Sequence, residues 1–181
     1  ELKEKGIKKF VTLATLSTLQ QKFWNYRGGW KEIISYLKNK GVAAVSVDLD
    51  VQFGSGVAKH GFPEFSSIPL RSIDMTGLSL SRVASLLNGG LFHMGLSSGI
   101  SWLAWAVNKP VVLICGHVNE RDDFSNPYRI QNKSVCHACW DRHKTTSEAL
   151  GDWYWCPDKK DFECTREITP DMVIEKIDQL L

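Results

Sequence analysis

The chain has 181 residues, of which 43% are hydrophobic and 23% are charged, and its formal net charge is +2. These proportions are those of an ordinary globular domain, so they exclude a disordered chain and a collagen-like repeat. The small net charge argues against a protein that binds nucleic acid through bulk positive charge. No apolar run approaches the ~18 residues of a membrane span, and the charged N-terminus is unlike a signal peptide. We therefore expect a cytoplasmic location, and because the chain begins with Glu1 rather than Met, we expect a fragment of a longer protein.

Apolar runs alternate with segments of helical periodicity over the first 116 residues. Strands are predicted at 8–16, 42–51, 71–77, 91–96 and 110–116. Helices are predicted at 28–41, which Gly41 ends, at 78–90 and at 97–109. The strands are apolar throughout, which is typical of a parallel sheet covered on both faces. The predicted fold class is therefore α/β, with a Rossmann-like parallel sheet and helices on both faces.

The alternation stops at Gly116. Residues 117–167 are polar and rich in Cys, His and Trp, with no periodicity, and a final helix is predicted within 168–181, with Thr169 as N-cap and Pro170 in its first turn. The prediction is one structural domain in three parts: a core at 1–116, a metal-binding segment at 117–167 packed on it, and the terminal helix at 168–181.

Four of the five cysteines lie in the middle part, spaced as Cys136-x2-Cys139-x16-Cys156-x7-Cys164. A CxxC pair places two sulfurs on one turn, and two later cysteines can complete a tetrahedron around zinc or iron. The alternatives are free buried thiols or one disulfide, and His117, His137 or His143 could substitute as ligands. Cys115 is predicted to be a small core residue. Five tryptophans are expected to pack around the metal and against the last helix, with stacking on a sugar or base as the alternative: Trp102, Trp105, Trp140, Trp153 and Trp155.

Small hydroxyl residues follow several predicted strands, where ligands bind in open α/β sheets. They are Ser17-Thr18-x3-Lys22, Leu78-Ser79-Leu80-Ser81 and Ser97-Ser98-Gly99. Backbone N–H groups at such helix starts can hold an anion, and Lys22 would add a charge for a diphosphate, although serine at a helix start is more often a simple cap. Asp48 or Asp50 could hold ribose hydroxyls or be a solvated carboxylate. A GxGxxG turn and a Walker motif are both absent from the sequence, which argues against a dinucleotide enzyme or an NTPase.

The stretch from Ser98 to Ile114 closely resembles the donor-site segment of bacterial heptosyltransferases, and above all the autotransporter heptosyltransferases. The resemblance continues through Asn126–Ile130, the four-cysteine segment and Ile168–Pro170, and upstream through Ser17–Trp24 and Ile73–Gly77. It implies the C-terminal, nucleotide-sugar-binding lobe of a B-type glycosyltransferase. In that family the donor is ADP-heptose, the acceptors are serines of an autotransporter adhesin, and four cysteines hold a structural iron ion, for which zinc is the alternative here.

The resemblance assigns roles to named positions. Lys22, with Thr18 nearby, matches the diphosphate-holding position, Ser97, Ser98 and Gly99 match the phosphate-binding helix start, and Leu78 and Ser79 match the segment along the adenine. The Asp-Thr-Gly-x-x-His of the lipopolysaccharide enzymes reads here as Ser97-Ser98-Gly99-x-x-Trp102, which favours the protein-modifying branch. The general base is expected in an N-terminal acceptor lobe that is absent here, so the fragment alone is expected to be inactive. His93 is expected to be core packing.

The predicted partners are a nucleotide-sugar donor, an adhesin acceptor, the N-terminal lobe of the same enzyme and further copies in a homo-oligomer, with no nucleic acid and no membrane span. The alternative function is a metal-stapled protein-interaction module without nucleotide-sugar activity. A zinc ribbon that binds nucleic acid is disfavoured, because acidic residues surround the cysteines. They are Asp141, Glu148, Asp152, Asp158, Asp161 and Glu163.

Overall fold

The computed structural model describes residues 2, 4, 6–51, 67–142 and 156–181. Within these residues, six strands form one parallel sheet in the order β3-β2-β1-β4-β5-β6. The strands are β1 (Phe10–Ala14), β2 (Ala43–Ser46), β3 (Ile73–Asp74), β4 (His93–Leu96), β5 (Val111–Ile114) and β6 (Arg129–Ile130). This is the strand order of a Rossmann fold, which confirms the predicted fold class.

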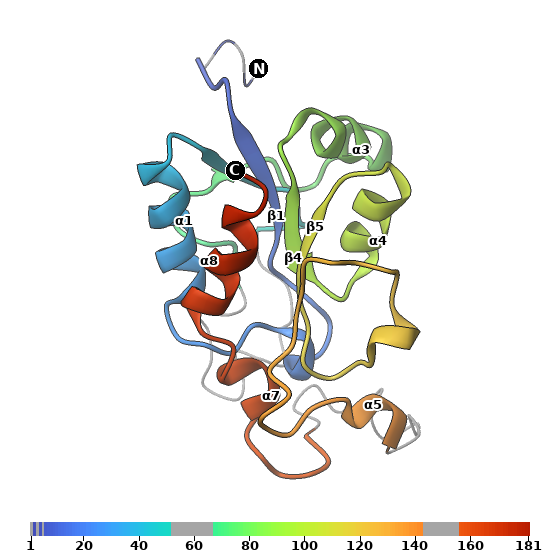
Figure 1. Cartoon of the computed structure of the whole chain (residues 1–181). Helices are drawn as coiled ribbons and strands as arrows, with labels where there is room; N and C mark the ends of the chain where they lie inside the picture. The colour runs from blue at the N-terminus through green and yellow to red at the C-terminus, as the bar shows by residue number, and fades with distance from the viewer. Residues whose placement is uncertain (1, 3, 5, 52–66, 143–155) are drawn as a thin grey trace.

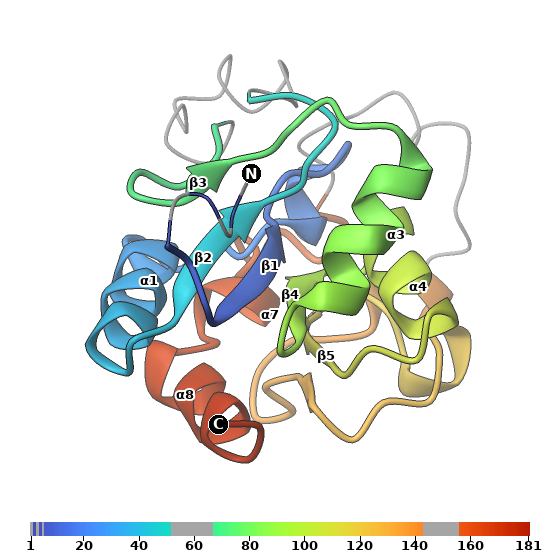
Figure 2. The same ribbon diagram turned by 90° about the horizontal axis from the view of Figure 1, so that it is seen from above.

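Helices cover both faces of the sheet (Figure 1). Viewed from above, α1 (Gly29–Asn39) and α8 (Pro170–Asp178) lie on one face, and α3 (Leu80–Gly89) and α4 (Gly99–Ala106) lie on the other (Figure 2). Short helices η1 (Gln20–Lys22), η3 (Glu120–Asp122), α5 (Cys139–Arg142) and α7 (Glu163–Arg166) occupy the connections. None of the described helices combines the length and the hydropathy that a membrane span requires.

Two apolar clusters hold the layers together, one on each face of the sheet. Strand β5 contributes to both, because Val112 and Ile114 face α1 and α8 whereas Leu113 faces α3 and α4. All three side chains are fully buried. This burial on both faces explains why the strand sequences are apolar throughout instead of alternating.

Some predicted elements differ in detail. The predicted strand at 42–51 is shorter in the structure, where β2 covers Ala43–Ser46. Beyond its end, the carbonyls of Ser46 and Asp48 accept backbone hydrogen bonds from Met75 and Gly77. Leu80, the first residue of α3, is 67% exposed. The sheet also gains β6 inside the range predicted as irregular, because Leu113 and Cys115 donate backbone hydrogen bonds to Tyr128 and Ile130.

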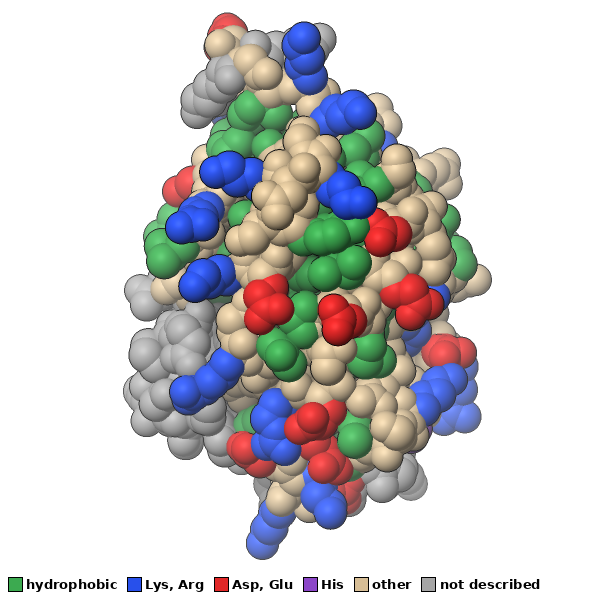
Figure 3. All heavy atoms as spheres, turned by 60° about the vertical axis from the view of Figure 1, so that its left-hand side comes forward, with side chains coloured by type: hydrophobic (Ala, Val, Ile, Leu, Met, Phe, Trp, Pro, Cys, Tyr) green, Lys and Arg blue, Asp and Glu red, His purple; other side chains and the backbone are tan. Residues whose placement is uncertain are grey.

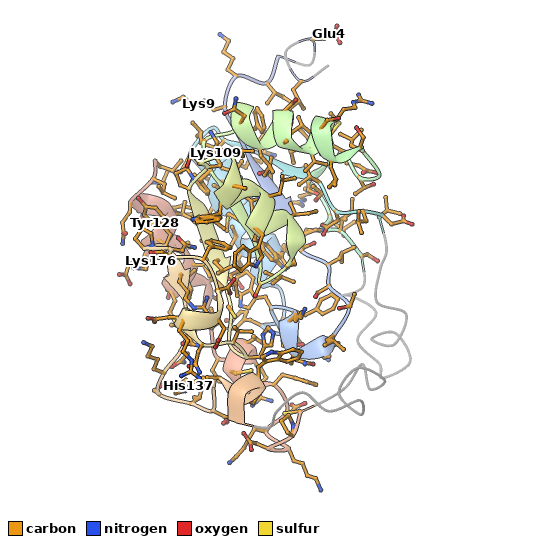
Figure 4. All side chains as sticks on the ribbon, turned by 90° about the vertical axis from the view of Figure 1, so that its right-hand side faces the viewer. Glu4, Lys9, Lys109, Tyr128, His137 and Lys176 are labelled. Atoms are coloured by element: carbon orange, nitrogen blue, oxygen red, sulfur yellow. The ribbon has the colours of Figure 1, made fainter. Side chains whose placement is uncertain are left out.

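Different structures lie at the amino ends and at the carboxyl ends of the strands. Lys9 and Lys109 mark the amino ends of β1 and β5, and His137 lies at the opposite end of the molecule (Figure 4). Below the carboxyl ends of the strands lie α5 and α7, which carry two of the four cysteines (Figure 1).

On the α1 and α8 side, basic and acidic side chains are mixed among the described residues, so no continuous basic surface forms there (Figure 3).

Candidate functional site

A cavity of about 540 Å³ lies at the carboxyl edge of the sheet. Its walls come from the segments that follow β1, β2 and β4 and from the first turns of α3 and α4. The chain reverses its direction of strand addition between β1 and β4, and ligands of open α/β sheets bind at such a switch point. The lining residues are Leu16, Ser17, Thr18, Lys22, Asp48, Leu49, Leu80, Ser98, Gly99, Ile100 and Leu103.

Lys22 provides the positive charge of this cavity. It closes the short helix η1 and is half-buried. Burial lowers the pKa of Lys22, and the nearby Cys115 and Asp123 act in the opposite direction. Lys22, Ser98 and Gly99 line the same cavity although 76 residues separate Lys22 from Ser98 in the sequence. An anion in the cavity would therefore meet the ammonium group and the start of α4 together.

The start of α4 is open toward the cavity. Ser98 has an extended backbone and, among the described residues, no side-chain hydrogen bond caps this end. Gly99 is exposed, and a Cβ added there would meet nothing within 4 Å. Ser101, one turn later, is buried and donates a 2.7 Å hydrogen bond to the carbonyl of Leu96, which fixes the helix to β4. The first backbone N–H groups of α4 can therefore bind an anionic group.

Asp48 organises the cavity instead of remaining a solvated carboxylate. Its side chain is buried, and its oxygens accept hydrogen bonds from the backbone N–H groups of Thr15 at 3.0 Å and Leu16 at 3.1 Å. Burial raises the pKa of Asp48 to about 6, and the hydrogen bonds from Thr15 and Leu16 oppose that rise. Asp48 thus joins the ends of β1 and β2, whereas Asp50 is exposed outside the cavity lining.

The remaining predicted donor-site residues lie around this cavity. Thr18 lines it with Lys22, Ser98 and Gly99. Ser97 precedes the α4 N-cap, and Leu78 and Ser79 precede α3, and these three are not among the described lining residues. The apolar part of the wall includes Leu80, which lies in a predicted strand-end segment, but sequence reasoning missed Leu49, Ile100 and Leu103. Position in the chain could have indicated these residues, because each follows a strand or lies in the first or second turn of a helix.

The four cysteines of the predicted metal site come together beside this cavity. Cys136, Cys139, Cys156 and Cys164 line one small cavity of about 10 Å³, and all four are free thiols. Burial raises the pKa of the Cys164 thiol, and Cys139, Cys156 and Cys136 add to the rise. Within the described residues, however, no three His, Cys, Asp or Glu side chains are arranged as a ready metal-ligand set. The thiols converge without adopting that geometry.

Polar contacts join the parts of the cysteine-bearing segment (residues 116–142 and 156–168) to one another. The Cys136 Sγ lies 3.2 Å from Asp158 Oδ2, and the Cys136 N–H donates to Glu163 Oε1 at 3.0 Å. The Ala138 N–H donates to the carbonyl of Gly116 at 2.8 Å. A Cβ on Gly116 would collide with the backbone of Cys164, so this approach requires glycine.

Two of the three histidines predicted as substitute ligands are described, and neither lines the cavity of the four cysteines. His117 is buried edge-to-face against Trp140, and burial lowers its pKa to about 3, with Lys22 and Arg129 adding to the effect. The His137 Nδ1 lies 2.7 Å from the carbonyl of Val135. His143 is outside the described residues. His93 and Cys115 are buried in the core, as predicted.

The tryptophan prediction was wrong for Trp102 and Trp105. They are 42% and 46% exposed on α4, where both rings contact Phe124. Helix α4 covers the face of the sheet away from α8, so these rings cannot reach the last helix (Figure 2). Trp24 takes that place, because its Nε1 donates to the carbonyl of Ile168 at 2.7 Å. Trp153 and Trp155 lie outside the described residues.

The chain is similar to known proteins both in sequence and in structure. No protein-family profile matches the chain. TibC, an autotransporter heptosyltransferase of Escherichia coli, is 39% identical over 176 residues, which cover 94% of this chain and 42% of TibC. The crystal structure of dodecameric, iron-containing TibC with ADP-D-beta-D-heptose superposes with a TM-score of 0.86 at 38% identity, over 96% of this chain and 45% of that one.

The chain is a homologue of the autotransporter heptosyltransferases. It spans about two fifths of the length of the curated relatives it matches. One of them, BimC of Burkholderia thailandensis, is described as an inactive autotransporter heptosyltransferase; it is 30% identical over 91% of this chain and 38% of BimC. The ADP-heptose lipopolysaccharide heptosyltransferase II of Escherichia coli shares the fold, with a TM-score of 0.64 at 16% identity over 99% of this chain and 49% of that one.

Proposed function

We propose that this chain is the donor-binding lobe of a heptosyltransferase that moves heptose from ADP-heptose to serines of an autotransporter adhesin. One observation carries the proposal: Lys22 and the open start of α4 line a single cavity at the switch point of the sheet. The homology to TibC, whose structure contains ADP-heptose, supports the choice of nucleotide sugar.

Within this lobe, the diphosphate would lie between Lys22 and the N-terminal turn of α4, with Thr18 and Ser98 as hydroxyl partners. Such groups stabilise the negative charge that develops on a departing diphosphate, which is the main electrostatic contribution expected in glycosyl transfer. The apolar wall of Leu49, Leu80, Ile100 and Leu103 suits the flat face of a base. Ser97, Leu78 and Ser79 remain predicted contacts at the edge of this site.

The transfer itself would need a second lobe. The bond between the sugar and the diphosphate breaks, a bond from sugar to serine oxygen forms, and the serine proton passes to a base. We assign that base to an acceptor lobe beyond this chain, because the described cavity presents Lys22 and Asp48 as its ionisable groups and the Asp48 oxygens already accept hydrogen bonds from the end of β1. A cytoplasmic location and assembly of several copies belong to the same proposal, and TibC is dodecameric.

We further propose that Cys136, Cys139, Cys156 and Cys164 hold a structural metal ion, iron as in iron-containing TibC or zinc. The fit rests on the donor set: four thiols line one cavity, which Asp158 and Glu163 also line. A bound ion would offset part of the negative charge of the thiolates and tie α5 to α7, which carry Cys139 and Cys164. Elemental analysis with a thiol titration tests the assignment, and a folded chain with four reactive thiols and no metal would refute it.

Calorimetry with ADP tests the donor site. Wild-type chain should bind ADP, and Lys22→Ala should weaken binding at least about tenfold, because a charge-assisted contact to the diphosphate is lost. Lys38→Ala on the exposed surface of α1 is the matched control and should bind as the wild type does. Equal affinity of wild type and Lys22→Ala would rule out the diphosphate role.

The predicted alternative, a metal-stapled interaction module, gains weight from the inactive relative BimC. That alternative requires a folded wild-type chain that does not bind ADP. The same calorimetry therefore separates the two functions without an activity assay.

A further inference from the structure

The side chain of Gln21 is buried without a hydrogen-bond partner. Gln21 is 1% exposed, and within the described residues neither its Nε2 nor its Oε1 has a hydrogen-bond partner. A buried amide with both polar atoms unpaired is costly and calls for an explanation. Gln21 lines the same small cavity as the four cysteines.

The main chain on either side of Gln21 joins two sites. Gln21 lies in η1 and lines the cysteine cavity, whereas the next residue, Lys22, lines the cavity at the switch point. Rotation or displacement of this one turn would move both side chains together. The helix η1 is therefore the shortest covalent path between the two sites.

The rest of this turn is bonded to the residues that follow Cys164. The Asn25 Nδ2 donates to Thr165 Oγ1 at 2.7 Å, and Asn25 Oδ1 accepts from Gln20 Nε2. The Trp24 indole N–H donates to the carbonyl of Ile168. All of Gln20, Gln21, Trp24, Asn25 and Thr165 are buried, so solvent does not compete for these contacts.

We propose that the Gln21 amide donates a hydrogen bond to a thiolate of the metal-loaded cysteine cluster and thereby couples that cluster to the position of Lys22. Metal-bound thiolate sulfurs accept N–H hydrogen bonds, and such outer contacts orient ligands and tune the metal. Gln21 is a positioning residue, and the coupling rests on the proposed function, in which Lys22 holds the donor diphosphate. Because coupling between two binding sites is reciprocal, metal raises ADP affinity and ADP raises metal affinity by the same factor.

Gln21→Met tests the proposal, because methionine keeps the length of the side chain and cannot donate. The affinity for Co²⁺, measured by its thiolate absorption in competition with a chelator, should fall about tenfold. The metal-free variant should unfold at a higher urea concentration than metal-free wild type, because an unpaired amide has left the interior. If Gln21 had a purely structural role, Gln21→Met would instead lower both the Co²⁺ affinity and the urea concentration at which the metal-free chain unfolds. Gln179→Met at the exposed end of α8 is the control and should change neither.

ADP calorimetry completes the test. Metal-loaded wild type should bind ADP several-fold more tightly than metal-free wild type, and Gln21→Met should shrink that difference. If wild type binds ADP but Gln21→Met keeps the Co²⁺ affinity and the full difference, the coupling proposal is overturned and the donor site stands. If wild type does not bind ADP at all, the proposed function fails first, and the Co²⁺ affinity of Gln21→Met still decides the hydrogen bond to the cluster.

Discussion

The sheet and the cysteine-bearing segment (residues 116–142 and 156–168) are ordered by different interactions. The sheet is held by fully buried apolar side chains on both faces, such as Leu13, Met94 and Leu113. Side chains of the cysteine-bearing segment such as Phe124 and Ile168 join these apolar clusters, but the segment also depends on individual hydrogen bonds, such as that from Asn132 Nδ2 to the carbonyl of Glu167 at 2.8 Å. Apolar burial is cumulative, whereas these polar contacts depend on a few individual groups.

Backbone geometry shows the same contrast. Four residues of the cysteine-bearing segment that are not glycine have positive φ: Ala138, Lys159, Asp161 and Phe162. Each left-handed residue costs on the order of 1 kcal/mol and persists only where surrounding contacts impose it. The described strands contain no such residue. A group that ties the four cysteines together would add to the contacts that impose these conformations.

The largest expected effect is at the border between the two regions. Arg129 in β6 and Asp123 form an ion pair with Nη1 and Oδ2 2.9 Å apart, and their side chains are 6% and 1% exposed. Arg129→Met leaves the Asp123 carboxylate buried and unpaired, so the free energy of unfolding should fall by about 3–5 kcal/mol. Urea unfolding measures this change.

The control for this variant is Arg166→Met, which breaks an exposed contact with Asp161 and Glu167. Exposed pairs contribute at most about 1 kcal/mol. A loss of the same size in both variants would mean that burial adds nothing to the contribution of the Arg129–Asp123 pair.

A slightly smaller effect is expected inside the sheet. Leu113→Ala in β5 removes a side chain that is fully buried and should lower the free energy of unfolding by about 3 kcal/mol. Hydrogen exchange should show lost protection throughout the sheet, because its layers share one packed interior. Leu70→Ala, at a residue 88% exposed, should change stability by less than about 0.5 kcal/mol. Loss of protection confined to β5 would contradict the contrast between the regions.

The sheet could be predicted from the sequence because its determinants are local. Runs such as Val111–Ile114 and the spacing of Ile33 and Leu37 follow the periods of strand and helix, and the structure contains both elements. Strand β6 was not predicted, because two residues carry no period. Its pairing depends on the Asn126 side chain, which donates to the carbonyl of Val111 and accepts from the N–H of Tyr128.

The candidate site was only partly predictable. Residue types at strand ends indicated Thr18, Lys22, Ser98 and Gly99, and the cysteine spacing indicated four residues that line one cavity. The role of Asp48 and the unpaired amide of Gln21 depend on contacts between distant segments, which no local pattern encodes. The predicted packing of Trp102 and Trp105 was wrong for the same reason, because an aromatic side chain does not indicate which face of a helix is covered.

The junction of β1 and β2 should give a pH dependence opposite in sign to that of buried His117 in the cysteine-bearing segment. The raised pKa of Asp48, about 6, means that the folded state binds the proton more tightly than the unfolded state. The stabilising contribution of this proton is complete below pH 4 and is lost as the pH rises to about 6, a change of up to about 3 kcal/mol. Burial lowers the pKa of His93 and of His117 to about 3, so these two groups stabilise the fold increasingly as the pH rises, and the Asp48 contribution is read as a difference between variants. In urea unfolding between pH 4 and 7, the stability of wild type relative to Asp48→Asn should fall as the pH rises, and Asp50→Asn should behave as wild type does.

The smallest expected effect concerns the start of α8, where the cysteine-bearing segment returns to the sheet. Thr169 is the N-cap, and its hydroxyl accepts the N–H of Met172 at 3.5 Å, a long hydrogen bond. Thr169→Ala should therefore cost only about 0.5 kcal/mol, the low end for an N-cap, and Thr169→Ser should cost less. Because Val173 and Ile177 anchor α8 in the interior by burial, the helix should persist in both variants. Circular dichroism during urea unfolding checks this result, and a loss of α8 in Thr169→Ala would show that polar contacts, rather than burial, hold the helix in place.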